Sequence, residues 1–377
     1  MKWWLFTMGM LVGLAVLSAC AAGEKATPAP TTLGAEGKAA WEQEWDRVLA
    51  AAKQEGKVAL LGPAGDDIRR ALTEPFEKKY GIAVEFQGGA GPEFGPKIRS
   101  EREAGQYLWD VYIHGTSTQL YALKPLGALD PIEPALILPE VKDPQQWRGG
   151  KLWFVDADRT TLMPILYSVY ALMVNPNLVK PEEFRSWKDL LDPKWKGRLL
   201  LHDPRVAGPS QALFAFFHQH KELGPDFIRA LARQEPALAR DLRQELDWLG
   251  AGRFPILIGG SKVVAVGMVK QGAPIGIVAP QQMKEGGFLA SGANTLSRFS
   301  RPAHPNAAKI YVNWFLSREG QIVYSRAAGS PSLRVDVPSD HAEPWELPQE
   351  GYWLIDTEEG RALEARVIPF LRELFGD

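Results

Sequence analysis

Cysteine and histidine are scarce in this sequence of 377 residues. There is one cysteine, Cys20, and there are six histidines. An internal disulfide needs two cysteines, and a structural zinc site of four cysteines, or of two cysteines and two histidines, needs more than one. The sequence therefore excludes both kinds of cross-link.

Excess charge of either sign is also missing. The chain has 43 Lys and Arg residues against 45 Asp and Glu residues, which gives a formal net charge of −2. Such a chain offers no basic field to DNA or RNA, so we expect no nucleic-acid partner. The apolar fraction of 45% and the charged fraction of 23% are those of a globular protein and exclude disorder for most of the chain.

Long apolar runs are missing everywhere except at the N-terminus. Residues 3–19 carry no charge and follow Lys2, and no Lys- or Arg-rich flank comes after them. This pattern favours a signal peptide over residues 1–19, with an uncleaved single-pass anchor as the alternative. Its end, Leu17-Ser18-Ala19-Cys20, resembles a bacterial lipobox, in which the cysteine is lipidated. We expect a lipoprotein held through Cys20 on the extracytoplasmic face of a cell membrane.

Residues 20–38 lack large apolar side chains almost completely. They are rich in Ala, Pro, Thr and Gly, and Leu33 is the one large apolar residue among them. Such a segment buries too little apolar surface to offset the entropy of ordering it. It is therefore interpreted as a flexible tether.

The rest of the chain alternates between apolar runs and helical patterns. Apolar runs at residues 57–61, 82–86 and 109–113 each end in Gly or small polar residues, and helical patterns separate them. This alternation predicts a parallel sheet with right-handed crossovers, which binds ligands at the carboxyl ends of its strands. Further strands are predicted at 167–175, 199–202, 254–258 and 275–280, and helices at 304–316, 321–328 and 357–375, whereas 127–165 is Pro-rich and irregular.

Motifs typical of enzymes are missing as well. The sequence contains no G-x-S-x-G elbow, no G-K-[ST] phosphate loop and no H-E-x-x-H zinc motif. Its single cysteine falls in the lipobox. We therefore expect a protein that is not an enzyme and needs no cofactor.

Four stretches together resemble a known family. They are KVALLGPAGDDIRRALTEPFEKKYGIAVEF, YLWDVYIHG, SVYALMVNPNLVKPEEFRSWKDLLDPKWKGRLLLHDPRVAGPS and RPAHPNAAKIYVNWFLSREGQ. Their order and spacing over about residues 55–335 are similar to those of the iron/anion-type substrate-binding proteins of ABC importers.

The resemblance implies an α/β, two-lobed periplasmic-binding-protein fold of the second type, with a hinge and a ligand cleft between the lobes. It also implies a monomer that delivers its ligand to an ABC permease and its ATPase. The corresponding boundaries are 39–166 for the first part of lobe 1, 167–280 for lobe 2, 281–320 for the return to lobe 1, and 321–377 for C-terminal helices on lobe 2 or the hinge.

Ligand contacts in lobe 2 are expected at two predicted strand-to-helix turns. The first turn holds Arg205, Ala207, Gly208 and Ser210, at a helix start whose free N–H groups and dipole favour an anion. Family members place a small Ser/Gly-rich turn here to hold an anion, although Pro209 removes one N–H group. The alternative is a turn that only caps its helix, with Arg205 as a solvated charge.

The second turn separates two classes of ligand. Ferric-binding relatives carry two adjacent tyrosines about here, whereas this chain has Gly260, Ser261 and Lys262. Lys262 then suits an anionic organic ligand as its counter-charge, and an ordinary capped turn is the alternative.

Ligand contacts in lobe 1 are expected at the ends of the first strands and at the hinge. Glycine and small residues there let a ligand approach the backbone, and a histidine or tyrosine could contact it. Turn geometry, a satisfied histidine and a core tyrosine are the alternatives. The candidates are Gly62, Ala64, Gly65, Gly89, His114, Thr116 and Tyr167.

The sequence thus predicts a solute-binding lipoprotein that captures a small anion by closure of two lobes. The anion is an organic phosphate or carboxylate, or ferric ion carried with a synergistic anion. The alternatives are a lipoprotein that presents its closed form to a membrane receptor and, less favoured, a lipid-anchored hydrolase.

Overall fold

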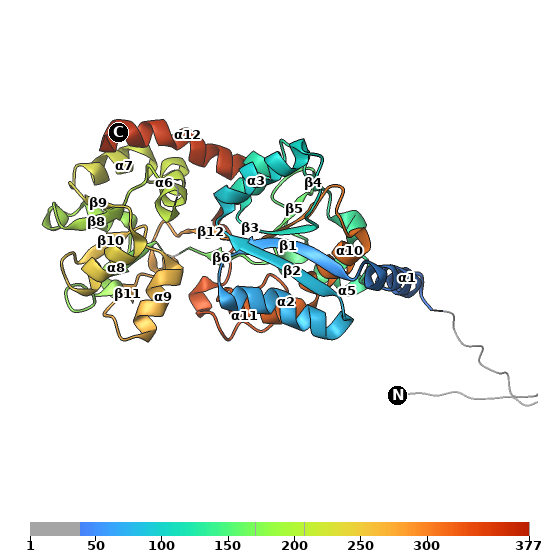
Figure 1. Cartoon of the computed structure of the whole chain (residues 1–377). Coiled ribbons are helices and arrows are strands. Elements are labelled where there is room, and N and C mark those ends of the chain that lie inside the picture. Colours follow the sequence, from blue (N-terminus) through green and yellow to red (C-terminus); the bar gives the residue numbers. More distant parts are fainter. Residues whose placement is uncertain (1–37, 170, 207, 377) are drawn as a thin grey trace, which may run out of the picture. The chain divides into compact units, whose positions relative to one another are not determined.

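The computed structural model describes residues 38–169, 171–206 and 208–376 (Figure 1). Residues 40–377 form one compact unit. The expected signal peptide, Cys20 and nearly all of the expected tether lie outside the described residues. None of the described helices is long and apolar enough to cross a membrane.

The first sheet belongs to lobe 1 and has the strand order β2-β1-β3-β13-β4, with β5 pairing to β13. The parallel pairing of β1 with β2 and β3 confirms the expected strand–helix alternation. β13 was not predicted, and it runs antiparallel to β3, β4 and β5. The strands are β1 (Lys57–Pro63), β2 (Ala83–Gly89), β3 (Val111–His114), β4 (Leu129–Asp130), β5 (Thr161–Leu162) and β13 (Thr295–Phe299).

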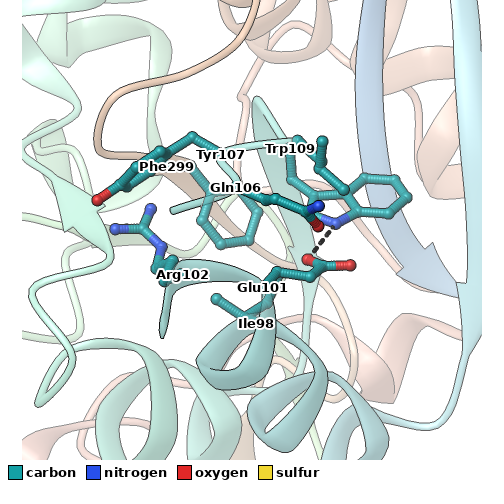
Figure 2. A pocket seen from close by; sticks show the side chains of 8 residues that line it. Ile98, Glu101, Arg102, Gln106, Tyr107, Trp109 and Phe299 are labelled. Atoms are coloured by element: carbon teal, nitrogen blue, oxygen red, sulfur yellow. Dashed lines mark hydrogen bonds between the residues drawn. The ribbon is translucent and has the colours of Figure 1, made fainter. Parts of the chain in front are cut away.

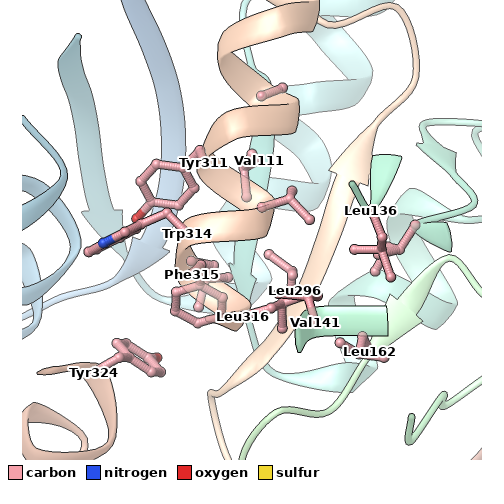
Figure 3. Close-up of a cluster of buried hydrophobic side chains, with 14 of the residues drawn as sticks. Val111, Leu136, Val141, Leu162, Leu296, Tyr311, Trp314, Phe315, Leu316 and Tyr324 are labelled. Carbon is pink, nitrogen blue, oxygen red and sulfur yellow. The ribbon is translucent and has the colours of Figure 1, made fainter. Parts of the chain in front are cut away.

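The helix α10 lies in the middle of the lobe 1 core (Figure 3). Tyr311 and Trp314 of α10 are fully buried, and their rings lie 4.9 Å and 5.4 Å from the ring of Phe76 on α2. Aromatic side chains bury large apolar areas, so this contact ties the C-terminal part of lobe 1 to its N-terminal part. The helices of the lobe are α1 (Ala40–Glu55), α2 (Asp66–Tyr80), α3 (Gly91–Glu103), the short α4 (Thr116–Thr118) and α5 (Pro139–Lys142), α10 (Pro305–Leu316) and α11 (Arg318–Ala327).

The second sheet belongs to lobe 2 and has the strand order β11-β7-β10-β8-β9. β8 runs parallel to β9 and β10, whereas β7 is antiparallel to β10 and β11. The strands are β7 (Leu172–Val174), β8 (Leu199–His202), β9 (Ala237–Ala239), β10 (Ile256–Ile258) and β11 (Gly276–Ile277). Its helices are α6 (Pro209–Gln219), α7 (Gly224–Ala232), α8 (Leu242–Gly250) and α9 (Lys262–Lys270).

A small third sheet marks the place where the chain passes between the lobes. Its order is β14-β12-β6, from β6 (Tyr167–Ser168), β12 (Phe288–Ala290) and β14 (Trp353–Leu354). The long strand predicted over 167–175 is therefore wrong in one respect, because β6 pairs here and β7 pairs in the second sheet. Tyr167, where the sequence placed the start of lobe 2, lies in β6 of this third sheet.

The C-terminal helices pack on different partners. α11 packs against α2 and α10 of lobe 1, whereas α12 (Glu358–Phe375) packs against α6 and α7 of lobe 2 (Figure 1). α12 lies wholly in the segment 321–377 that the sequence assigned to lobe 2 or the hinge, whereas α11 begins at Arg318, inside the expected return to lobe 1, and packs on lobe 1. Between the strands, residues 127–165 form mainly short 3₁₀ turns, as their proline content indicates.

Candidate functional site

The predicted residues of lobe 1 lie along one edge of the first sheet. Parallel pairing of β1 and β2 sets Gly62 beside Gly88 and Pro63 beside Gly89. A β-carbon on Gly62 would lie 2.7 Å from the Phe86 ring, so glycine is required there by packing. Ala64 and Gly65, which follow in the turn before α2, are exposed and open to a ligand.

His114 ties two strands of this edge together. The N–H of Gly115 donates to its Nδ1 at 2.7 Å, so Nδ1 carries no proton and Nε2 donates to the Gly89 carbonyl at 3.2 Å. Burial lowers the pKa of His114, which agrees with a neutral ring. Both ring nitrogens are thus engaged by the backbone of lobe 1.

Thr116, two residues further on, lies beside a buried carboxylate. Asp356 accepts hydrogen bonds from the N–H and hydroxyl of Ser291 and from Arg361. Burial alone would raise the pKa of Asp356, but Arg361 and the donors from Ser291 and Thr116 outweigh it and lower the pKa. The predicted residue Thr116 therefore contacts the segment that leads into α12.

Tyr167 connects this edge to lobe 2. A β-carbon on Gly292 would lie 2.9 Å from the Tyr167 hydroxyl, and the carbonyl of Gly292 faces Gly115. The ammonium of Lys262, the first residue of α9, lies 4.8 Å from the centre of the Tyr167 ring. Burial raises the pKa of Tyr167, and the carboxylates of Asp356 and Glu346 raise it further, so the ring stays a neutral phenol.

Lys262 is held by groups from the C-terminal part of the chain. Its ammonium donates to the Gly329 carbonyl at 2.8 Å and pairs with Glu346, which is 3% exposed. Burial lowers the pKa of Lys262 and raises that of Glu346, while their mutual attraction opposes both shifts. The cation that the sequence assigned to an anionic ligand is thus balanced by an internal carboxylate.

The two predicted turns of lobe 2 adjoin each other. Gly259 has a φ of +81°, and a β-carbon there would lie 1.9 Å from the Ser210 hydroxyl and 3.4 Å from the β-carbon of His202. Gly260, next in the chain, packs against Met173 of β7. The turn Gly259–Lys262 therefore lies directly against the start of α6, where Gly208 and Ser210 are found.

A buried histidine–carboxylate pair lies under the α6 turn. Nδ1 of His202, at the end of β8, is 2.8 Å from a carboxylate oxygen of Glu245 on α8. Both side chains are almost fully buried. Among the described residues, Nε2 of His202, the second oxygen of Glu245 and the hydroxyl of Ser210 have no hydrogen-bond partner.

Arg205 is directed to a different place. Its guanidinium makes two hydrogen bonds of 2.8 Å to Asp203 and donates to the carbonyls of Phe375 and Gly376 at the end of α12. A cation is favourable at a helix C-terminus. Arg205 thus clamps α12 onto lobe 2, and a contact from it to a ligand stays a prediction.

The candidate site is this connected series of turns: the edge of lobe 1, Tyr167, Lys262, and the α6 turn. Ala207, also predicted for it, lies outside the described residues. Sequence reasoning missed Glu346, Glu245 and His202 as site residues. His202 carried a visible signal, since it ends an apolar run ahead of the α6 turn, whereas the two glutamates are brought in by tertiary folding.

Two hollows of the described surface differ in what they could hold. The one in Figure 2 lies under Trp109, whose indole N–H donates to Glu101 at 2.9 Å, and its volume of about 10 Å³ suits a single water molecule. The other, of about 360 Å³, lies beside the site between α9 and α11 and is lined partly by Lys262, Lys270, Arg326 and Glu346. Only the second has room for a small solute.

Metal ligands are not gathered at the site. In the described part of the chain, no group of three or more His, Cys, Asp or Glu side chains is arranged to hold a metal ion. The sequence also contains no two adjacent tyrosines.

Comparisons with known proteins point to one family. Residues 71–349 match the model of the family described as "Bacterial extracellular solute-binding protein". An uncharacterized protein of Haemophilus influenzae is 25% identical over 287 residues, which is 73% of this chain and 77% of that protein.

Solved structures share the fold. The periplasmic binding protein AfuA of Actinobacillus pleuropneumoniae, with exogenous fructose-6-phosphate bound, superposes with a TM-score of 0.56 at 20% identity, covering 84% of this chain and 99% of the other. The Trichodesmium protein IdiA (FutA), in complex with iron and citrate, gives a TM-score of 0.61 at 17% identity, covering 85% and 98%. At these identities the match shows the two-lobed type 2 fold.

Proposed function

The chain belongs to the family of bacterial extracellular solute-binding proteins, and from this premise we propose that it captures a small anionic solute for an ABC importer. The solute binds at the series of turns from the lobe 1 edge through Tyr167 and Lys262 to the start of α6. Closure of the two lobes then shifts the population toward the liganded form, which delivers the solute to the permease and its ATPase. The proposal assigns the chain no reaction.

One observation carries this proposal: turns from both lobes, predicted separately, meet at Tyr167 and Lys262. The ammonium of Lys262 lies over the Tyr167 ring and beside the first turn of α9. The start of α6 lies against Gly259 of the same turn and offers backbone N–H groups and the positive end of a helix dipole. This helix N-terminus and a lysine carried on the adjoining turn favour a ligand with negative charge.

The chemistry of the donors favours an organic phosphate or carboxylate. Hard ferric ion prefers oxygen ligands with negative charge, and the tyrosine here is a neutral phenol beside a cation. Among proteins of the same fold, one holds a sugar phosphate and another holds iron with citrate. Ferric ion carried by an organic anion is thus the second candidate, with the anion bound at Lys262 and α6.

The location of the protein follows from its N-terminus in this proposal. Cys20 is lipidated, the preceding segment is removed, and residues 20–38 tether the body at the extracytoplasmic face of the membrane. A tether of about 19 residues in a flexible chain spans roughly 25 Å on average, which keeps the body within reach of a membrane permease.

A thermal-shift screen tests the ligand class. The chain without residues 1–37, which keeps every described element, is screened against inorganic phosphate, sugar phosphates, dicarboxylates, ferric citrate and neutral sugars. A ligand at 100 times its Kd stabilises the folded state by about 2.7 kcal/mol and raises Tm accordingly. We expect a rise with a phosphate or carboxylate that is lost in Lys262→Met. A rise with neutral sugars alone would contradict the proposal.

A further inference from the structure

His202 is held in one orientation by a carboxylate. Nδ1 of the ring lies 2.8 Å from Glu245, and a carboxylate can only accept a hydrogen bond, so Nδ1 carries a proton. The other nitrogen, Nε2, accepts a hydrogen bond when the ring is neutral and donates one when the ring is the protonated imidazolium.

Nε2 points toward the turn that begins α6. A β-carbon on Gly208, the residue that caps α6, would lie 2.6 Å from Nε2. The absence of a β-carbon lets the Gly208 backbone lie against the ring, so Nε2 faces the start of α6, and Gly208 itself is exposed to solvent.

The polar atoms around this space lack partners. In the described structure, Nε2 of His202, the hydroxyl of Ser210 and one oxygen of Glu245 make no hydrogen bond, and all three are buried. Buried polar groups in native proteins are mostly satisfied, because a buried group without a partner is costly. A purely structural histidine–glutamate pair would not explain two unpartnered polar groups at the same helix start.

The charges that reach His202 come from three elements. Glu245 faces it from α8, and Asp203 follows it at the end of β8. Asp203 is balanced by Arg205 from the same turn and by Arg240 from the segment after β9. In the described contacts, Asp203 is paired with two arginines, whereas no arginine or lysine pairs with Glu245. Glu245 is therefore the carboxylate whose charge acts on the His202 ring.

We propose that His202 and Glu245 bind a proton together with the ligand: Nε2 donates to a tetrahedral oxyanion held at the start of α6, and each anion captured brings one proton onto the imidazole. This inference rests on the proposed function, because it takes the α6 turn as the anion subsite. The donors at this subsite are the backbone N–H groups at the start of α6, the hydroxyl of Ser210 and the protonated ring of His202. Because these donors belong to different parts of the turn, they suit a tetrahedral phosphate group better than a planar carboxylate. Anion affinity then falls as pH rises, by up to tenfold per unit.

Calorimetry in two buffers tests the proton directly. Sulfate is the probe, because it stays a dianion from pH 5 to pH 9 and any proton taken up must reach the protein. The chain without residues 1–37 is titrated at pH 7.5 in buffers of low and high ionisation enthalpy. We expect uptake of close to one proton per sulfate, and affinity at least tenfold higher at pH 6 than at pH 8.

Three variants locate the proton. His202→Gln is expected to lose the uptake and to weaken sulfate binding at least tenfold, and Glu245→Gln to lose most of the uptake. Gly208→Ala would place a methyl group 2.6 Å from Nε2, which displaces the ring relative to the start of α6, and it is expected to weaken binding as well. His220→Gln, at the other end of α6, is the matched control and keeps both uptake and affinity.

The possible outcomes distinguish a failure of this inference from a failure of the proposed function on which it rests. Sulfate binding without proton uptake overturns the role of His202 and leaves the anion subsite standing. Absence of binding by sulfate and by phosphate overturns the role of His202 and the α6 subsite, and the proposed function is overturned as well when the sugar phosphates, dicarboxylates and ferric citrate of the thermal-shift screen also fail to bind. If His202→Gln does not fold, as seen by circular dichroism, the uptake by the unaltered chain and the Gly208→Ala variant still decide.

Discussion

The hydroxyl of Ser210 leaves no room for a side chain at residue 259. Gly259 has a φ of +81°, and its missing β-carbon would lie 1.9 Å from that hydroxyl. Only glycine adopts this conformation without strain, and here it also permits the close approach of α6 to the end of β10. A single residue thus determines how two turns of the candidate site fit together.

Gly259→Ala is therefore expected to destabilise the fold more than a glycine change without a neighbour. Gly272 has a similar φ of +87° with nothing within 4 Å of its missing β-carbon, so Gly272→Ala serves as the control. We expect about 1 kcal/mol for Gly272→Ala from backbone strain, and about 1–3 kcal/mol more for Gly259→Ala from overpacking. Urea unfolding of both variants measures this, and equal losses would contradict the packing argument.

Asp203 gives a second prediction, which depends on pH. Burial alone would raise the pKa of Asp203, but hydrogen bonds from Arg205 and Arg240 outweigh it and hold the pKa well below its usual range. A depressed carboxyl pKa contributes stability above the unfolded value of about 3.9, and that contribution is lost as pH falls below it. Arg240 is 63% exposed, so most of the effect comes from Arg205.

Asp203→Asn is expected to cost about 1–3 kcal/mol at pH 7 and much less at pH 2.5. Urea unfolding of the variant and the unaltered chain at both pH values measures the difference. Asp226→Asn, at a side chain that is 97% exposed, is the control and should change stability little at either pH. A loss that stays the same at pH 2.5 would show that the charge of Asp203 is not its cause.

Among the helices, α12 has the clearest structural role. It packs against α6 and α7, and its last carbonyls receive hydrogen bonds from Arg205. At its other end Glu358 pairs with Lys124 of lobe 1. α12 thus links α6 to both lobes.

Leu371→Ala tests this role of α12. Leu371 is 1% exposed in the lobe 2 core, and removal of a buried leucine side chain costs about 2–5 kcal/mol. Glu373→Ala, on the exposed face of the same helix, is expected to stay within about 0.5 kcal/mol. The free energy of unfolding measures both, and a loss for Leu371→Ala no larger than the control's would show that α12 is dispensable for lobe 2.

The sequence predicted elements well where local patterns decide them. The runs at 57–61 and 82–86 lie in β1 and β2, because apolar runs closed by glycine specify buried strands. β13 was missed, since Thr295–Phe299 mixes polar and apolar residues and its pairing with β3 joins residues about 180 positions apart. Such pairing follows from tertiary packing and leaves no local signal.

The candidate site shows the same difference between features set by local sequence and features set by tertiary folding. Glycine turns at strand ends are local patterns, and in the structure Gly259 lies against Ser210 and Lys262 lies beside Tyr167. The partners of the charged residues are not local: Glu346 reaches Lys262 from 84 residues away, and Phe375 reaches Arg205 from 170. The sequence could therefore place a cation, but it could not indicate which cation would be neutralised by the protein itself.

For the whole molecule, the anchor is the feature that the sequence predicts most specifically. Cys20→Ser removes the only thiol in the chain and with it the proposed site of lipidation. We expect the variant to leave the membrane fraction after cell fractionation, with its Tm and its ligand-induced shift unchanged, because the described elements begin at Ala40. Ser18→Thr, a change within the lipobox that keeps the cysteine, is the comparison. Persistent membrane association of Cys20→Ser would exclude a lipid anchor at this residue.

The order of the strands along the chain also bears on how the protein is made. The lobe 2 sheet is built from a continuous stretch, β7 to β11, and is complete once residue 277 has been synthesised. The lobe 1 sheet begins with Lys57, yet β13, which joins β3 to β4, ends only at Phe299. During vectorial synthesis or export the lobe that starts first is therefore finished last. Its first three strands must wait, with an open edge, while more than 180 residues emerge, and this is the interval in which a chaperone would find the chain exposed.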